Sequence, residues 1–272
     1  MPAPDRPTIT STRNPLVQRC RAAAAGDDPA VLLAEGVRLV QEGLDAGAPA
    51  RLAVVSSRLR EPALRERLDQ VAEELVECSD AVLARASGLD THQGVAVVFA
   101  RPQWTDADLL RRRACASREE GGAALVLAAA GVRDPGNLGA LLRSSEAAGA
   151  TGVLTQRGGA DPFRDKAVRG SMGSVFRLPV QHGRDAAGLL AFARAHGLQV
   201  VVADGHGEVD HTRADLRGPV LLVLGAEAAG IAPELRAGAD VRARIPLQAP
   251  VESLNVAVAA GVLLFEARRQ RG

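Results

Sequence analysis

The 272-residue chain is poor in aromatic residues, cysteine and lysine. Aromatic residues make up 2% of it and tyrosine is absent, so little aromatic surface is available for stacking on nucleic-acid bases. The three cysteines form no Cys-x-x-Cys pair, which excludes a disulfide scaffold and a cysteine-based zinc site. His206 and His211 are five positions apart rather than the four of a helical ligand pair, so we expect no metal.

Long apolar segments are also missing. No stretch approaches the ~20 residues that a membrane-spanning helix requires, and residues 1–12 contain no apolar signal core. The composition, with 47% hydrophobic and 24% charged residues, is that of an ordinary globular protein. We therefore expect a cytoplasmic protein that makes no contact with the membrane.

Positive charge is carried almost entirely by arginine. The chain has 33 basic and 32 acidic residues, and Lys166 is its only lysine. The planar guanidinium fork suits phosphate, and arginines cluster in the first 25 residues and at Arg111, Arg112 and Arg113. The triple cluster is explained equally well as a phosphate-binding patch and as a solvated face.

The first hundred residues alternate between helical and strand patterns. Strands are expected at 52–55 and 94–99, and two sets of apolar residues have the spacing of a helix face: Leu33, Val37, Val40 and Leu44, then Leu64, Leu68, Val71 and Leu75. Residues 1–100 are thus predicted to form a small α/β domain. The polar residues 101–121 are predicted to be a linker, with one helix from Thr105.

The remaining residues, 122–272, predict a larger α/β domain. Apolar runs occur at 123–129, 152–154, 200–203, 220–224 and 241–245, and helical patterns at 138–148, 186–196 and 254–268. Near-continuous apolar strands that alternate with helices indicate a parallel sheet covered on both faces. Such sheets bind ligands at the carboxyl ends of their strands.

Three segments near those strand ends contain the chain's most distinctive polar residues. After the first strand, Asn137 suits a helix N-cap, and Arg143 follows six residues later. After the strand at 220–224, the small residues 225–230 include a single acid, Glu227. In the third segment Ser253 suits an N-cap, whereas Asn255 is expected just inside an apolar helix, where its low propensity indicates a function. Taken singly, each segment is explained as well by a turn and a helix start.

Together and in this order, the segments resemble the three motifs of the SpoU/TrmH family of RNA 2′-O-ribose methyltransferases, in the SPOUT class. These motifs are an Asn-x-Gly…Arg loop and helix, a strand followed by Gly-x-Glu-x-x-Gly, and Ile-Pro…Ser-Leu-Asn. Residues 168–179 are similar to a further stretch of many members, and residues 35–40 resemble the start of a ribosomal-protein-like substrate-binding domain. Ala249 stands where glycine is common, and Gly136 where a polar residue is frequent.

The resemblance implies a fold, a cofactor and a set of site residues. S-adenosylmethionine would be bound in a deep trefoil knot of the C-terminal domain, lined by Gly225, Ile245 and Leu254. The residues implied around the transferred methyl group are Asn137, Arg143, Glu227, Ser253 and Asn255. The N-terminal domain would bind RNA, with Arg13 and Asn14 as further candidates, and members of the family act as homodimers.

Each implied catalytic residue has a chemical role to fill. A ribose hydroxyl is a poor nucleophile, so methyl transfer requires proton removal or stabilisation of the developing charge. A neutral guanidine is costly because its pKa is above ~12, so we favour Arg143 as an oxyanion and phosphate clamp over a general base. Ser253 and Asn255 are interpreted as positioning residues, while Glu227 suits a structural and a catalytic role equally.

Other functions remain open on the sequence alone. Large-subunit rRNA is the preferred substrate over tRNA, because similar two-domain members mostly act on it. An RNA-binding protein with an inactive methyltransferase domain is a second possibility. A Rossmann-type dehydrogenase or conventional methyltransferase is suggested only by residues 204–207, which lack the third glycine of that motif.

Overall fold

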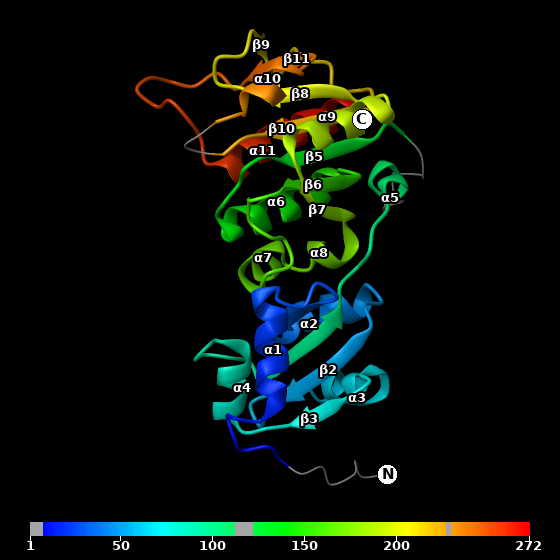
Figure 1. The fold of residues 1–272 in the computed structure, drawn as a ribbon, viewed down its shortest axis with the longest axis vertical. Coiled ribbons are helices and arrows are strands. Elements are labelled where there is room, and N and C mark those ends of the chain that lie inside the picture. The colour runs from blue at the N-terminus through cyan, green and yellow to red at the C-terminus, as the bar shows by residue number, and fades with distance from the viewer. Residues whose placement is uncertain (1–7, 112–121, 227–229) are drawn as a thin grey trace. The chain divides into compact units, whose positions relative to one another are not determined.

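The computed structural model describes residues 8–111, 122–226 and 230–272, and the chain divides into two compact units (Figure 1). Unit 1 comprises Met1–Gln103 and Phe163–Arg177, and unit 2 comprises Trp104–Pro162 and Leu178–Gly272. This division differs from the predicted domains 1–100 and 122–272, because the segment that carries helices α7 and α8 packs in unit 1. In the described ranges no helix is long and apolar enough to cross a membrane.

Unit 1 contains a four-stranded mixed sheet in the order β1-β4-β2-β3, in which β4 runs antiparallel to both neighbours and β3 is parallel to β2. Its strands are β1 (Val31–Glu35), β2 (Ala50–Val55), β3 (Leu75–Glu77) and β4 (Val95–Ala100). Its helices are α1 (Pro15–Ala25), α2 (Val37–Asp45), α3 (Pro62–Val71), α4 (Asp80–Ser87), α7 (Asp165–Ser171) and α8 (Ser174–Arg177). The strands predicted at 52–55 and 94–99 correspond to β2 and β4.

Both predicted helix faces of unit 1 extend too far along the sequence. Leu33 is buried in β1, because Gly36, with φ +85°, breaks the chain before α2 begins. Leu75 starts β3, because α3 ends at Val71 and Ala72 is already extended. In each case the helical spacing of apolar residues extends by chance across a turn into a strand, where pairing within the sheet determines the conformation.

The apolar core of unit 1 lies between the sheet and the paired helices α1 and α4. Leu16 and Val17 on α1 and Leu83 on α4 are buried in one cluster with residues of β2 and β4. Cys20 and Cys78 are buried free thiols in the same cluster. Burial raises the pKa of Cys20 to about 12 and that of Cys78 to about 11, so both stay protonated and unreactive at neutral pH.

Unit 2 is built on a seven-stranded sheet in the order β7-β6-β5-β10-β8-β11-β9, in which every neighbouring pair is parallel. Its strands are β5 (Leu125–Ala129), β6 (Gly152–Gln156), β7 (Val180–Arg184), β8 (Gln199–Ala203), β9 (Val209–Asp210), β10 (Val220–Leu224) and β11 (Val241–Arg244). Its helices are α5 (Asp106–Leu110), α6 (Pro135–Ala148), α9 (Ala186–Ala195), α10 (Pro233–Ala237) and α11 (Val256–Gln270). The predicted parallel α/β sheet is confirmed.

Both faces of this sheet are covered. Every residue of β5 and β10 is buried. Helices α5, α9 and α10 share one apolar cluster with alternate strand residues such as Val126 and Val223. Because side chains alternate across a strand, the buried Leu127 and Leu222 face the other side. The helices α6 and α11 pack against each other.

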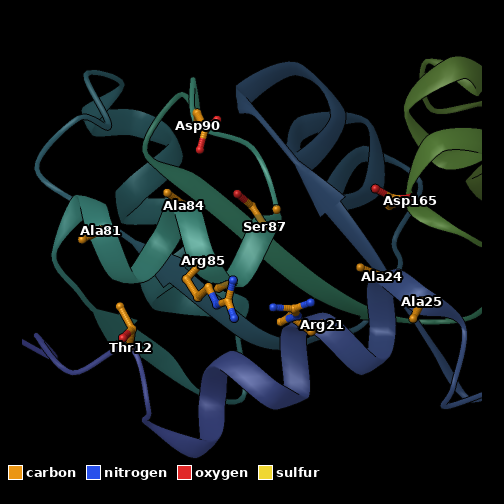
Figure 2. Close-up of a pocket in the computed structure, with 12 residues that line it drawn as sticks. Thr12, Arg21, Ala24, Ala25, Ala81, Ala84, Arg85, Ser87, Asp90 and Asp165 are labelled. Carbon is orange, nitrogen blue, oxygen red and sulfur yellow. The ribbon is translucent and has the colours of Figure 1, made fainter.

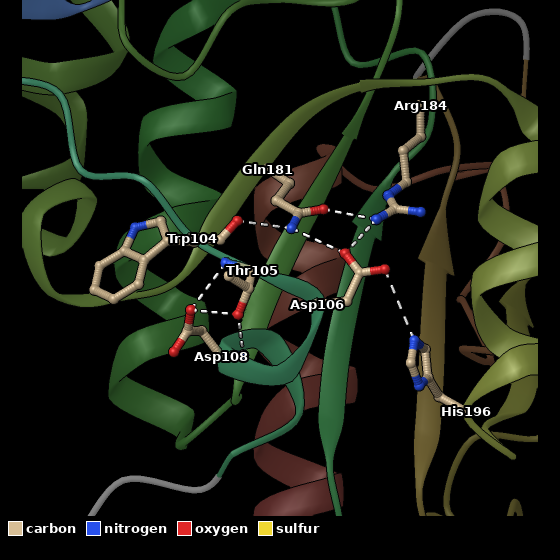
Figure 3. Close-up of polar contacts among 7 residues, drawn as sticks. All are labelled: Trp104, Thr105, Asp106, Asp108, Gln181, Arg184 and His196. Carbon is tan, nitrogen blue, oxygen red and sulfur yellow. Dashed lines mark hydrogen bonds and ion pairs between the residues drawn. The ribbon is translucent and has the colours of Figure 1, made fainter.

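The start of the predicted linker 101–121 is packed structure in unit 2. The predicted helix from Thr105 is confirmed: the Thr105 hydroxyl and the Asp108 carboxylate form a reciprocal capping box. Asp106 accepts hydrogen bonds from Arg184 at 2.6 Å and from Gln181 at 3.0 Å (Figure 3). Leu109 is fully buried, so this segment is anchored to the sheet by both polar and apolar contacts.

Candidate functional site

The carboxyl ends of three neighbouring strands of unit 2, β10, β8 and β11, open into a cavity of about 190 Å³. Gly225 follows β10, Asp204 follows β8 and Ile245 follows β11. Leu254, which precedes α11, and Ser253 also line the cavity. The parallel sheet therefore brings together segments that are far apart in the sequence.

Backbone packing shapes one wall of this cavity. A Cβ atom on Gly225 would lie 2.4 Å from the carbonyl oxygen of Gly230, so any side chain there would push the loop away. Gly230 and Ala226 exchange backbone hydrogen bonds of 2.8 and 3.2 Å. The absence of a side chain at Gly225 thus lets the backbone of Gly230 pack against the end of β10 and form this wall. Glu227, between these two residues, lies outside the described residues.

The polar and apolar groups of the cavity suit a nucleoside. Asp204 has a side chain only 5% exposed; its Oδ1 accepts the N–H of His206 at 3.0 Å, and the Arg236 Nε lies 3.0 Å from Oδ2. Much of the remaining wall is apolar and includes Leu224, Ile231, Ile245, Leu247 and Leu254. Apolar walls with a few fixed polar groups are typical of cofactor sites, so these residues fit an adenosyl group.

A second cavity, of about 720 Å³, adjoins the first. The two share Ala226, Gly230, Ile231 and Val256 as lining residues. Asn137, Arg133 and Arg157 line the second cavity. A cofactor in the first cavity would therefore face a larger, partly basic space in which a second substrate can bind.

The amides of Asn137 and Asn255 connect the first and third motifs. Asn255 Nδ2 donates to Asn137 Oδ1 at 3.1 Å, although the residues are far apart in sequence. Asn255 also caps α11, since its Oδ1 accepts the N–H groups of Ala257 at 2.9 Å and Val258 at 3.4 Å. This side-chain pair fixes the ends of two packed helices beside the cavities.

The two helix starts predicted in these motifs, at Asn137 and Ser253, are wrong in position. Asp134, not Asn137, is the N-cap of α6, because Pro135 occupies the first helical position that proline favours. Asn255, not Ser253, is the N-cap of α11. Asn255 therefore does not lie inside the helix at a cost in propensity, and it occupies a position that asparagine prefers.

Within one chain, Arg143 lies away from the Asn137–Asn255 pair and from both cavities. It is exposed on α6, six residues and thus ~9 Å along the helix from Asn137. Among the described residues that line the two cavities, Asn137 and Ser253 are present and Arg143 is not. Of the predicted catalytic residues, the structure gathers Asn137, Ser253 and Asn255.

The predicted RNA-binding residues differ in their surroundings. Arg13 is exposed, and the side-chain oxygen of Asn14 is occupied in capping α1 by accepting the Leu16 N–H at 3.0 Å. Arg111 is exposed at the end of α5. Arg112 and Arg113 lie outside the described residues.

A hollow of about 670 Å³ beside α1 and α4 contains basic groups of unit 1 (Figure 2). Arg21 comes from α1 and Arg85 from α4, and both guanidinium groups point into it. Paired guanidinium groups suit a phosphate.

The sequence prediction did not select Arg85, or Asp204, Arg133 and Arg157 of unit 2. Asp204, Arg133 and Arg157 each follow the carboxyl end of a buried strand, by one to four residues. This position after an apolar run was the signal in the sequence that could have identified them.

An all-parallel sheet with a nucleoside-type cavity at its carboxyl edge defines an α/β enzyme that uses a nucleoside-containing cofactor. Family models make this specific: residues 124–265 match the SpoU rRNA Methylase family, and residues 27–97 match the MRM3-like substrate binding domain. The chain belongs to the SpoU rRNA methylase family, and the predicted family is confirmed.

Similar curated proteins include the 23S rRNA (guanosine-2'-O-)-methyltransferase RlmB of Xylella fastidiosa. It is 43% identical over 181 residues, which cover 66% of this chain and 71% of that protein. An uncharacterized tRNA/rRNA methyltransferase of Synechocystis is 30% identical over 272 residues, covering 98% of this chain and 95% of the relative.

Solved structures agree with these relatives. The AdoMet-bound rRNA methyltransferase from Sinorhizobium meliloti has a TM-score of 0.83 at 32% identity, over 97% of both chains. The SpoU methyltransferase AviRb from Streptomyces viridochromogenes, in complex with AdoMet, has a TM-score of 0.83 at 25% identity, over 95% of this chain and 98% of that one.

Proposed function

We propose that this chain transfers the methyl group of S-adenosylmethionine to a ribose 2′-hydroxyl of large-subunit ribosomal RNA, in the cytoplasm. The observation that carries the proposal is the nucleoside-type cavity at the ends of β8, β10 and β11, beside the Asn137–Asn255 pair. The Xylella relative acts on a guanosine 2′-O of 23S rRNA, and both similar structures hold AdoMet.

The proposal assigns Gly225, Ile245 and Leu254 to the cofactor. When bound, S-adenosylmethionine supplies an activated methyl group on a sulfonium centre. The backbone at Gly225 offers hydrogen-bonding groups at close range, and the side chains of Ile245 and Leu254 offer apolar contact. The proposal includes the deep trefoil knot that the family resemblance implies for unit 2.

The residues around the second cavity position and stabilise the ribose. Asn137 and Asn255 hold each other in place, so both side chains are oriented before the substrate arrives. Ser253, at the boundary of the first cavity, is a further positioning residue. We retain both roles considered for Glu227, ordering of the loop and contact with the reacting atoms.

Arg143 is proposed to clamp RNA phosphate and developing negative charge. A general base must lie within hydrogen-bond reach of the proton that it removes. Arg143 lines neither cavity in the described part of the chain, and its guanidinium would be costly to deprotonate. Its exposed place on α6 suits a phosphate next to the target ribose.

Unit 2 is proposed to form a homodimer through α11. Although Ala260, Leu263 and Leu264 of this helix are buried, Val258 is 53% exposed and Phe265 is 50% exposed. These two residues are seven positions apart and share one helix face. An exposed apolar face of this kind is typical of a protein interface.

The dimer is tested by Phe265→Glu, with Val71→Glu as a control at an equally exposed apolar position of α3. Sedimentation velocity is expected to show a dimer for the wild type and the control, and a monomer for Phe265→Glu. A monomeric wild type, or a dimer that survives Phe265→Glu, would refute this interface.

The activity is tested by transfer from radiolabelled S-adenosylmethionine to unmodified rRNA and tRNA, followed by alkaline hydrolysis. We expect label in alkali-resistant dinucleotides from 23S rRNA, and its loss in Arg143→Ala and Arg143→Lys. Lysine loses a proton more readily than arginine but cannot form the bidentate fork, so an active Arg143→Lys would contradict the clamp. Label on tRNA alone would show that the substrate is tRNA and contradict the assignment to rRNA. Absence of both label and cofactor binding would favour an RNA-binding protein with an inactive methyltransferase domain.

A further inference from the structure

Unit 1 contains a small pocket to which neither the proposed reaction nor the family comparison assigns a role. Its volume is about 200 Å³, and its lining includes Glu35, Gly36, Arg38, Gln93, Arg169 and Met172. These residues come from the end of β1, the start of α2, the segment before β4, and α7 with its C-cap. The pocket thus lies wholly within unit 1.

Glu35 is the unusual member of this pocket. Its side chain is only 4% exposed, and although the Ser87 hydroxyl lies nearby, neither carboxylate oxygen has a partner with hydrogen-bond geometry among the described residues. The nearest opposite charge is Arg169, whose Nη1 lies 4.0 Å from Glu35 Oε2 and only 2.9 Å from Asp165. A buried carboxylate with unfilled acceptors is costly, so this geometry favours a ligand that donates hydrogen bonds.

Gln93 places a hydrogen-bond donor in the same pocket. Its Oε1 accepts the Val37 N–H at 2.8 Å, which leaves the amide Nε2 as the group that can donate to a ligand. Gly36 permits this contact, since a Cβ there would lie 2.8 Å from Gln93 Oε1. The pocket therefore combines two acceptor oxygens with one amide donor.

Two other side chains of the pocket, Arg38 and Met172, offer surfaces for contact with the face of an aromatic ring. The Arg38 side chain is 75% exposed, and its guanidinium plane suits stacking on a base. Met172 is 36% exposed and has φ +50°, a conformation that residues with a side chain rarely adopt. A polarizable thioether makes favourable contact with an aromatic ring.

We propose that this pocket binds a guanine base of the RNA substrate. Guanine carries two adjacent donors, N1–H and N2–H, that match the two oxygens of Glu35, and its O6 accepts from Gln93 Nε2. Adenine and cytosine offer an amino group next to a ring acceptor, which the carboxylate would repel, and the single imino donor of uracil lies between two carbonyl groups. Bases in single-stranded RNA are read in this way, by their Watson–Crick edge and by stacking.

This inference rests on the proposed function, because it takes RNA as the substrate. It makes the pocket a specificity-determining site of the unit whose residues 27–97 match a substrate-binding domain. A purely structural role for Glu35, as a distant partner of Arg169 with water on its oxygens, predicts that the pocket has no preference among bases.

The chain contains its own reporter for the test. It has two methionines, Met1 and Met172, so labelling with ¹³C-methyl methionine gives one signal from the pocket and one internal reference. The full-length protein is titrated with guanosine, inosine and adenosine 5′-monophosphates at about pH 8, where the Glu35 carboxyl is mostly ionised, and the Met172 signal is assigned with Met172→Leu. Inosine lacks only the N2 amino group, so it isolates one of the two donors.

We expect a saturable shift of the Met172 signal with the guanosine nucleotide, about tenfold weaker binding of the inosine nucleotide and no saturable shift with adenosine. Glu35→Gln should abolish the preference, because it replaces one acceptor by a donor. Glu66→Gln, the same change at an exposed position of α3, should keep it. Equal shifts with all three nucleotides, no shift with guanosine, or a preference that survives Glu35→Gln would overturn the proposal.

The methyl-transfer assay separates this inference from the proposed function. A guanosine preference without methyl transfer would support the pocket and contradict the enzyme. Methyl transfer without a preference would support the enzyme and overturn the pocket. Thermal unfolding of Glu35→Gln serves as the control for folding.

Discussion

Asn255 combines two roles that separate substitutions can distinguish. Its oxygen caps α11 while its amide nitrogen donates to Asn137. A cap of this kind contributes about 1 kcal/mol to stability. The bond to Asn137 lies beside the proposed ribose site, so its value is in orientation more than in stability.

At the residue scale, we therefore expect Asn255→Asp and Asn255→Ala to differ. Aspartate keeps an acceptor at the N-cap but loses the donor to Asn137, so Tm should stay close to that of the wild type while methyl transfer falls at least about tenfold. Alanine should lose both, with a further cost of about 1 kcal/mol in the free energy of unfolding. Equal activity of wild type and Asn255→Asp would show that the bond to Asn137 is dispensable.

Gly225 and Gly205, two of the glycines that line the cofactor cavity, form a matched pair for substitution. In Gly225→Ala the new Cβ would lie 2.4 Å from the Gly230 carbonyl, whereas Gly205→Ala meets nothing within 4 Å. We expect Gly225→Ala to weaken S-adenosylmethionine binding about tenfold or more, measured by isothermal titration calorimetry, and Gly205→Ala to change it little. Similar affinities for the two variants would contradict the proposed wall at Gly225.

Glu35 makes the stability of unit 1 depend on pH. Burial raises the pKa of this carboxyl from 4.5 to about 7, although the nearby Ser87 hydroxyl and Arg169 guanidinium oppose the rise, and Asp165 adds to it. The folded state then binds more protons than the unfolded state between these values. Stability from this group is therefore full below about pH 4.5 and is lost as the pH rises through about 7.

We accordingly expect Glu35→Gln to be more stable than the wild type at about pH 8 and to differ little at about pH 5. Urea unfolding at both pH values measures this, with Glu66→Gln as the control for the loss of a surface charge. A stabilisation that is equal at the two pH values would mean that the Glu35 carboxyl titrates normally.

At the scale of elements, strands were easier to predict than helix ends. The buried strands β5, β8 and β10 were visible as apolar runs, because both faces of a parallel sheet are covered. Helix starts were misplaced at Asn137 and Ser253, because several residues in each segment are competent caps and only tertiary packing selects one.

Helix α5 is the element whose attachment is most easily tested. Asp106 accepts from Arg184 and Gln181, and the His196 ring nitrogen lies 3.7 Å away (Figure 3). We expect Asp106→Ala to lower the free energy of unfolding by roughly 1–2 kcal/mol, since it removes a partly exposed ion pair with Arg184 and one of the two hydrogen bonds that Gln181 Nε2 donates, the other being to the Trp104 carbonyl.

Asp215→Ala is the matched control, because its pair with Arg217 lies two residues away on an exposed loop. It should cost less than Asp106→Ala in the same urea titration. An Asp106→Ala variant as stable as the wild type would show that Leu109 alone anchors α5.

For the whole molecule, the sequence was sufficient for the class of fold, and the predicted domains 1–100 and 122–272 differ from the two compact units at residues 163–177. Periodicity and apolar runs indicate an α/β sheet, but nothing in residues 163–177 signals that they pack with unit 1 instead of their sequence neighbours. The motifs located Gly225, Ile245 and Leu254, which share one cavity. The pocket at Glu35 could not be foreseen, because a buried and unpaired carboxylate is recognisable only once its surroundings are known.

The strand order of unit 2 sets the time at which the enzyme can first be assembled. The central strand β10 pairs with β5, so that Leu125 lies beside Val220, and α11 closes the unit at the end of the chain. During synthesis, β6 gains both of its neighbours, β5 and β7, once residue 184 has been made, whereas the second neighbour of β5 is β10 and exists only after residue 224. A growing chain would therefore expose one unpaired edge of the apolar strand β5, and a ribosome stalled before residue 220 would carry no cofactor site at all.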